Sequence, residues 1–200
     1  MFAQRSWIAV LLSVAVLAMA IASFLLPWYH IEQDVLTVSS ERQFKLQEVR
    51  SVVTASSESS HLERVSTSSY DDPPDFLEVG DLMRLETAIL LVTIVMQMVF
   101  VATCLVGAKK VAILTGALSF LLLVVTWVVF FASIEGAVNS SDWAEQGFNE
   151  PISGFIGSSE MSVVGVEIVT SWGPLTGWAL LVGGTVAQVG AVLAVIRRAA

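Results

Sequence analysis

The chain has 200 residues, of which 55% are hydrophobic and only 14% are charged, and its mean hydropathy is +0.76. Average soluble domains are about 45–50% apolar and about 25% charged, so this composition excludes an ordinary soluble domain. The single cysteine excludes a disulfide framework and an all-cysteine zinc site, since both need at least two. The net charge of −8 argues against nucleic acid as a partner, because a nucleic-acid-binding face is basic.

Four apolar runs are long enough to cross a membrane. About 20 helical residues span the roughly 30 Å of hydrocarbon, and none of the four runs has a charged residue in its interior. The sequence therefore predicts an all-α membrane fold, with a lipid bilayer as its first partner. This fold is a four-helix transmembrane bundle with spans at 7–28, 87–108, 111–134 and 174–196, the second and third joined by a turn at 109–110.

The first run has an alternative interpretation as a cleaved signal peptide. Arg5 precedes the run, and Ala18-Met19-Ala20 has the pattern of a cleavage site. However, the apolar run continues to Trp28, which is longer than the usual 7–15 residues of a signal sequence. A retained helix is the favoured interpretation.

The basic residues predict the orientation of the spans. Short basic segments stay on the cytoplasmic side of a membrane. One side of the predicted topology has five basic residues and no acid, whereas the other has a net charge of −13. We therefore expect a multi-pass protein of the cell membrane with both termini in the cytoplasm. The residues on the basic side are Arg5, Lys109, Lys110, Arg197 and Arg198.

The two outer segments, 29–86 and 135–173, predict a small antiparallel β-sheet that forms an extracellular cap. The first is too long for a bare connection. A lone strand is unstable in water, so strands of both segments are expected to pair in one sheet. The period-two pattern favours strands at 34–39, 43–53, 61–67 and 161–170, and residues 76–84 favour a short helix before the second span.

Two polar features of the outer segments have functional alternatives. The acidic residues between Asp71 and Asp81 could indicate calcium, but Pro73-Pro74 replaces the alternating ligands and glycine of an EF-hand loop, which favours a solvated turn. Asn139-Ser140-Ser141 is a formal glycosylation sequon. Whether Asn139 is glycosylated is left open by the sequence.

Candidate interaction residues lie within the spans. Small residues spaced by four predict a face for close helix packing, either between copies or within the bundle. The two amides deep in the membrane, Gln97 and Gln188, are expected to hydrogen-bond between helices rather than to form a polar pathway. Aromatic residues at the span ends are expected to be interface anchors. The small residues are Ala179, Gly183, Ala187 and Ala191, and the anchors are Trp28, Tyr29, Trp172 and Trp178.

The sequence argues against enzymatic activity. It has no G-x-S-x-G, P-loop or H-E-x-x-H motif, and its only cysteine, Cys104, lies inside a span, where a thiol is a small hydrophobe. The two histidines have no cysteine partner for a metal site. We expect no catalytic residue, no cofactor and no bound metal.

The layout resembles the claudin-like four-span group, which includes claudins and the peripheral-myelin and calcium-channel-gamma relatives. Leu26-Pro27-Trp28 at the end of the first span is similar to that group, as are the long first outer segment and the tight inner turn. The W-GLW-C-C signature of the group is absent, so the resemblance implies the fold alone.

The sequence therefore predicts a non-enzymatic integral membrane protein that acts in adhesion, in scaffolding or as an accessory subunit. It would act through its outer β-cap or through its small-residue helix faces, with a second copy or another membrane protein as partner. The alternative is a small cation channel or transporter component, which the acidic outer face favours and the uncharged spans disfavour.

Overall fold

A computed structural model of the chain describes residues 7–57, 60–70, 76–142 and 151–197. They form two compact units. Residues 7–25, 86–129 and 177–197 make up the helical unit. The sheet unit contains the remaining described residues, which lie within 26–85 and 130–176.

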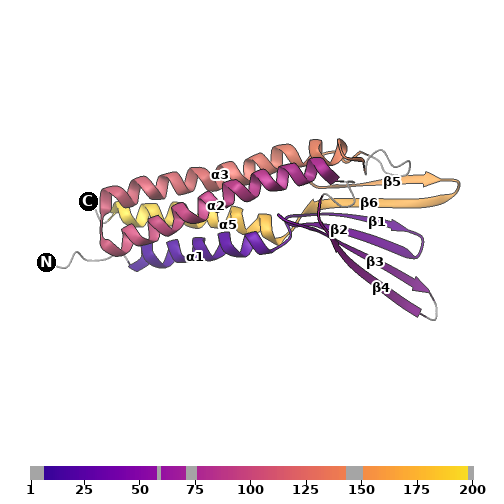
Figure 1. Cartoon of the computed structure of the whole chain (residues 1–200), viewed down its shortest axis with the longest axis horizontal. Helices are drawn as coiled ribbons and strands as arrows, with labels where there is room; N and C mark the ends of the chain where they lie inside the picture. The colour runs from indigo at the N-terminus through magenta and orange to yellow at the C-terminus, as the bar shows by residue number, and fades with distance from the viewer. Residues whose placement is uncertain (1–6, 58–59, 71–75, 143–150, 198–200) are drawn as a thin grey trace. The chain divides into compact units, whose positions relative to one another are not determined.

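Among the described residues, four helices are long and apolar enough to cross a membrane, as the sequence predicts. In Figure 1 they run side by side, and the indigo start of the first lies at the same end of the bundle as the yellow end of the last. The helices are α1 (Trp7–Leu25), α2 (Leu77–Val106), α3 (Lys109–Asn139) and α5 (Thr176–Arg197).

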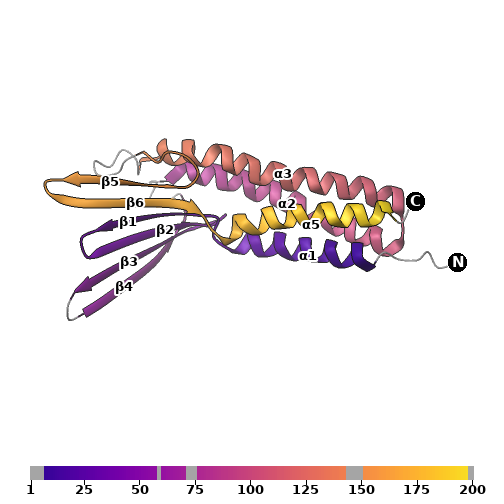
Figure 2. The same ribbon diagram turned by 180° about the vertical axis from the view of Figure 1, so that it is seen from behind.

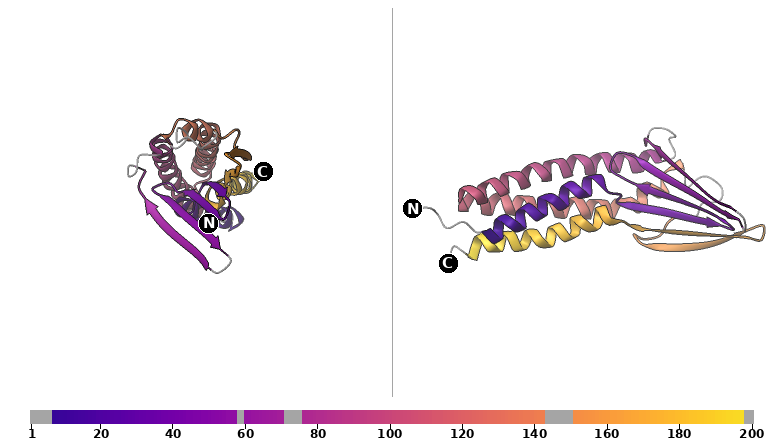
Figure 3. Two further views of the ribbon diagram at one scale, coloured as in Figure 1. Left: turned by 90° about the vertical axis from the view of Figure 1, so that its right-hand side faces the viewer. Right: turned by 90° about the horizontal axis from the view of Figure 1, so that it is seen from below.

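The buried sides of α1, α2 and α5 repeat at alternating spacings of four and three residues, whereas α3 has a run of four-residue spacings. In α2 the buried series is Glu86, Leu90, Thr93, Gln97 and Phe100. This seven-residue repeat is the pattern of left-handed bundle packing, and Figure 3 shows the four helices end-on. The other sides of the helices are apolar, as in a bundle whose surroundings are lipid.

The helices differ in length from the predicted spans. Helix α1 ends at Leu25, before Trp28, whereas α2 begins at Leu77 and absorbs the short helix expected at 76–84. The connection between α2 and α3 lies at 107–108, where Gly107 has a φ of 76°, so Lys109 already belongs to α3.

The sheet is antiparallel and six-stranded, with the order β4-β3-β2-β1-β6-β5. The pairing of β1 with β6 joins the two predicted outer segments, which confirms the expectation of one shared sheet. Figure 2 shows the strands from behind. The strands are β1 (Tyr29–Val35), β2 (Val38–Phe44), β3 (Val49–Ser57), β4 (Ser60–Ser68), β5 (Gly157–Val163) and β6 (Val166–Pro174).

Three of the four predicted strands are wrong, because each contains a hairpin turn. The range 34–39 crosses the β1–β2 turn, 43–53 crosses the β2–β3 turn, and 161–170 crosses the β5–β6 turn. The range 61–67 lies inside β4, as predicted. The β1–β2 and β5–β6 turns begin with the apolar residues Leu36 and Val164, which extend the period-two pattern. Gly165, with a φ of 81°, is the glycine that marks the β5–β6 turn.

Candidate functional site

A hydrogen-bond network joins all four helices of the helical unit at one level. The Gln97 amide donates to the main-chain oxygen of Ser13 at 2.9 Å and to the Gln188 side-chain oxygen at 3.1 Å. The Ser119 hydroxyl donates to the Gln97 side-chain oxygen at 2.5 Å. The Gln188 amide donates to the main-chain oxygen of Gly116 at 3.0 Å. The two amides singled out from the sequence therefore bond directly to each other.

The chemistry of this network is structural. Amides and hydroxyls do not ionise near neutral pH, and the network gives hydrogen-bond partners to the amide nitrogen and oxygen of Gln97, which would otherwise be costly in an apolar interior. Such bonds contribute on average about 0.6 kcal/mol each between membrane helices. The network fixes which residues of the four helices lie at the same level.

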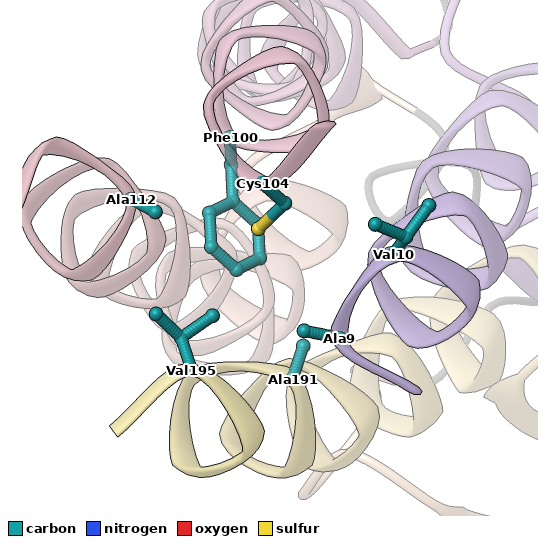
Figure 4. Close-up of a cluster of buried hydrophobic side chains, with 7 residues drawn as sticks. All are labelled: Ala9, Val10, Phe100, Cys104, Ala112, Ala191 and Val195. Atoms are coloured by element: carbon teal, nitrogen blue, oxygen red, sulfur yellow. The ribbon is translucent and has the colours of Figure 1, made fainter. Parts of the chain in front are cut away.

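An apolar cluster fills the helical unit toward the α2–α3 connection. Figure 4 shows its side chains pointing toward one another from all four helices. Cys104 is 7% exposed within it, so its thiol is enclosed by hydrocarbon and is not placed for nucleophilic chemistry. The cluster consists of Ala9, Val10, Phe100, Cys104, Ala112, Ala191 and Val195.

The four small residues of α5 do not share one environment. Ala191 is fully buried in the apolar cluster and Ala187 is half-buried, whereas Ala179 and Gly183 are exposed. A Cβ atom added at Gly183 would meet nothing within 4 Å. Ala191 therefore packs inside the bundle, and the Ala179–Gly183 end of the stripe is open.

Two other glycines of α5 lie close to α1. A Cβ atom at Gly190 would lie 3.4 Å from Leu12, and one at Gly184 would lie 3.8 Å from Met19. The close approach of these helices is thus made by Gly184 and Gly190, which the four-residue spacing in the sequence did not single out.

The expected interface anchors lie inside the protein. Trp28 and Tyr29 have no exposed surface, and Trp28 packs edge-on against Phe130 with ring centroids 5.2 Å apart. Trp172 is 4% exposed, and its indole nitrogen donates to the main-chain oxygen of Gly154 at 3.1 Å. These three rings form part of the core of the sheet unit.

The fourth anchor, Trp178, belongs to the helical unit. It is half-buried and packs edge-on against Trp127, with ring centroids 6.3 Å apart. Its indole nitrogen lies 3.5 Å from the main-chain oxygen of Trp127. The ring therefore joins α5 to α3.

Both tyrosines of the sheet unit serve as neutral donors. Burial, with a smaller effect of the Glu135 charge, raises the pKa of Tyr29, and its hydroxyl donates to the main-chain oxygen of Phe155 at 3.1 Å. Burial likewise raises the pKa of Tyr70, whose hydroxyl donates to the main-chain oxygen of Lys45. Neither phenol is activated for chemistry.

One face of the sheet has an apolar row that crosses all six strands in register. The strand pairings place six apolar residues directly beside one another in this row. Leu62 is 69% exposed and Val38 is 40% exposed, whereas Ile168 is only 6% exposed. In strand order from β4 to β5, the row is Leu62, Ala55, Val38, Val35, Ile168 and Met161.

Two hairpin turns next to this row have exposed apolar residues. Leu36, between β1 and β2, is 80% exposed, and Val164, between β5 and β6, is 100% exposed. Both have positive φ angles, 53° for Leu36 and 52° for Val164. Because β1 and β6 are adjacent, the two turns lie at the same end of the sheet. We call these two residues and the six-residue row the apolar sheet surface.

Exposed acidic residues lie on the opposite face of the sheet. Alternation along the strands places Asp34, Glu63, Glu160 and Glu167 on the side away from the apolar row, and all four are exposed. The described part of the sheet thus has the apolar row on one face, together with Arg42 and Arg64, and these acidic residues on the other face.

A cavity of about 240 Å³ lies within the sheet unit. It is smaller than the roughly 300–1,000 Å³ of pockets for drug-sized ligands. Arg42 lies in its wall, with its guanidinium carbon 5.7 Å from the centre of the Phe76 ring. The remaining lining residues are Val49, Ser51, Ser66, Ser68, Ser69 and Tyr70.

Glu86 is a buried residue that the sequence placed in the outer segment. It lies within α2, has no exposed surface, and neither carboxylate oxygen has a hydrogen-bond partner among the described residues. Among the described Asp, Glu, Lys and Arg residues, Glu86 is the only one that is fully buried. Its place in the series Glu86, Leu90, Thr93, Gln97 was the signal that could have found it.

Asn139 makes two hydrogen bonds to the main chain of Ile152, as donor and as acceptor, both of 2.8 Å. Its amide thus binds the main chain of Ile152 on the far side of the loop after α3.

Across the residues that the structure describes, no three His, Cys, Asp or Glu side chains lie close enough to hold a metal ion. Asp71 and Asp75 lie outside the described residues.

Comparison with known proteins gives no relative. No family model matches the chain, and no curated protein matches its sequence. The resemblance to the claudin-like group stays a prediction.

Proposed function

We propose that this protein is a non-enzymatic membrane protein that is anchored by its four helices and binds a partner protein through the apolar sheet surface. In this proposal it acts in adhesion, in scaffolding or as an accessory subunit. The observation that carries the proposal is the pair of exposed apolar residues with positive φ, Leu36 and Val164.

These two residues are unfavourable for folding alone. Hairpin turns that need positive φ are normally made by Asn, Asp or Gly, and a backbone strained in this way costs about 1–3 kcal/mol. Val164 is β-branched, which makes positive φ especially rare. Leu36 and Val164 also leave apolar surface in water. A role in binding accounts for both costs, because a partner would cover that surface.

The charges around the apolar sheet surface favour another protein over a lipid surface. The whole chain has a net charge of −8, which repels an anionic bilayer. On the face of the row itself Arg64 is exposed two residues from Leu62, whereas the four exposed acidic residues lie on the opposite face. The occupant we propose is therefore an apolar segment of another protein, bordered by an Asp or Glu that faces Arg64.

The proposed location is the cell membrane, with the sheet outside and both termini in the cytoplasm. Lys109 and Lys110 at the α2–α3 connection, and Arg197 at the end of α5, support this orientation by the rule that basic segments stay inside. The lipid bilayer is then the partner of the apolar helix faces.

A cation channel is the second candidate, favoured by the polar interior of the helical unit around Gln97. The apolar cluster near the α2–α3 connection disfavours it, because a filled hydrocarbon segment blocks hydrated ions. We therefore rank binding above transport.

Photo-crosslinking in the native membrane tests the proposed binding. A diazirine-bearing aliphatic amino acid at position 36 or 164 is expected to capture one discrete protein, at a yield about tenfold above a probe at Ser162, which lies on the acidic face of β5. The capture should be lost in the Leu62→Asp variant, and the site in the captured protein should be apolar with an acidic neighbour. Capture of lipid or of a second copy alone, or equal capture from position 162, would overturn the proposal.

A further inference from the structure

Glu86 lies at a definite level of the helical unit. The bonds of Gln97 to Ser13 and Gln188 place these three residues at the same level. Helix α1 runs antiparallel to α2 and α5 runs parallel to it, so the residues at other levels can be counted from there. Glu86 precedes Gln97 by eleven residues, or about 16 Å along the helix. The corresponding positions are close to Ser23 on α1 and Gly177 on α5, both of which are buried.

Helix α3 brings a second unsatisfied polar atom near the same level. Ser119 bonds to Gln97, and Trp127 lies eight residues, about 12 Å, further along α3. The indole nitrogen of Trp127 is buried and has no hydrogen-bond partner in the part of the chain that the structure describes. The end of the helical unit nearest Glu86 thus has an unpaired carboxyl group and an unpaired N–H donor.

No cation neutralises Glu86 from the described elements of the helical unit. The described residues of α1 are uncharged, and the basic residues of α3 and α5 are Lys109, Lys110 and Arg197, at the opposite end. On α2 itself, Arg84 is exposed and bonds to the exposed Asp81 at 3.0 Å. An ionised carboxylate at Glu86 would be a buried charge with no cation beside it in the described helical unit, which is strongly unfavourable.

We propose that Glu86 is a proton-binding site, a function independent of partner binding by the sheet. The proton neutralises the carboxyl group and allows it to lie in the interior of the helical unit, one turn from the buried Leu90. Because the apolar cluster fills the other end of the helical unit, the site takes up its proton from the Glu86 end and does not pass it through the bundle.

Infrared spectroscopy of the full chain in liposomes at pH 7 tests this proposal. An exposed glutamate has a pKa of about 4.3, so only about one in 500 is protonated at that pH. We expect a protonated-carboxyl band for more than half of the Glu86 groups, over a hundredfold above the exposed value. The band should be absent from Glu86→Gln and retained in Glu78→Gln, a matched change at an exposed position of α2.

Glu86→Asp keeps a carboxyl group and should shift the band rather than remove it, which covers the case that Glu86→Gln does not fold. Absence of the band from the unchanged protein at pH 7, or its retention in Glu86→Gln, would overturn the proposal. Loss of the band on adding Na⁺ or K⁺ at constant pH would also overturn it, because the site would then bind a metal cation.

Discussion

Gly80→Ala is expected to destabilise the sheet unit by about 1–3 kcal/mol, as overpacking of a filled site does. A Cβ atom at Gly80 would lie 2.6 Å from the Cβ atom of Tyr70, well inside contact distance. Tyr70 cannot yield easily, because it is 3% exposed and its hydroxyl donates to the main-chain oxygen of Lys45. Thermal unfolding in mild detergent, followed by tryptophan fluorescence, measures the effect as a lower melting temperature.

Gly136→Ala is the matched control for this prediction. Gly136 also lies in a helix, but a Cβ atom there would meet nothing within 4 Å. Alanine is favoured over glycine within a helix by about 0.5–1 kcal/mol, so this variant should melt at or above the temperature of the unchanged protein. Equal melting temperatures for the two variants would show that the close contact at Gly80 is not rigid.

Gln97→Leu is expected to destabilise the helical unit by about 2 kcal/mol. The change removes the bonds of Gln97 to Ser13, Ser119 and Gln188, and membrane hydrogen bonds average about 0.6 kcal/mol each. Thr93→Val is the control, because Thr93 is equally buried but its hydroxyl bonds only within its own helix, to Ile89 at 2.8 Å. Unfolding of both variants in detergent should show the larger loss for Gln97→Leu.

A double-mutant cycle separates the network from simple packing. If Gln97 and Gln188 act together, the combined leucine variant should lose less stability than the sum of the single changes. Strict additivity would contradict the network as the feature that fixes the helix level.

The helices could be predicted because membrane spans have a strong local signal. A run of about 20 apolar residues without charge is typical of a membrane-spanning helix, and all four predicted runs correspond to helices. The ends of the helices depend on tertiary packing instead. The second predicted span began after Glu86 because Glu86 is charged. In the structure Glu86 is buried, and α2 begins nine residues earlier, at Leu77.

The sequence predicted one antiparallel sheet, but not which residues of neighbouring strands pair with each other. A turn is recognised from Asn, Gly, Pro or Asp, whereas here Leu36 and Val164 occupy turn positions and are residue types typical of strands. The row from Leu62 to Met161 depends on the register of five strand pairs, which no local pattern determines. The surface that carries the proposed function therefore became visible only in three dimensions.

We propose that the four helices cross the membrane and hold the sheet on its outer side. Single cysteines in a Cys104→Ala background test this topology with a membrane-impermeant maleimide on intact cells. A cysteine in place of Ser162, exposed on β5, should react in intact cells, and one in place of Lys109, exposed at the start of α3, should react only after permeabilisation. The reverse pattern, or reaction of both cysteines in intact cells, would contradict the proposed topology.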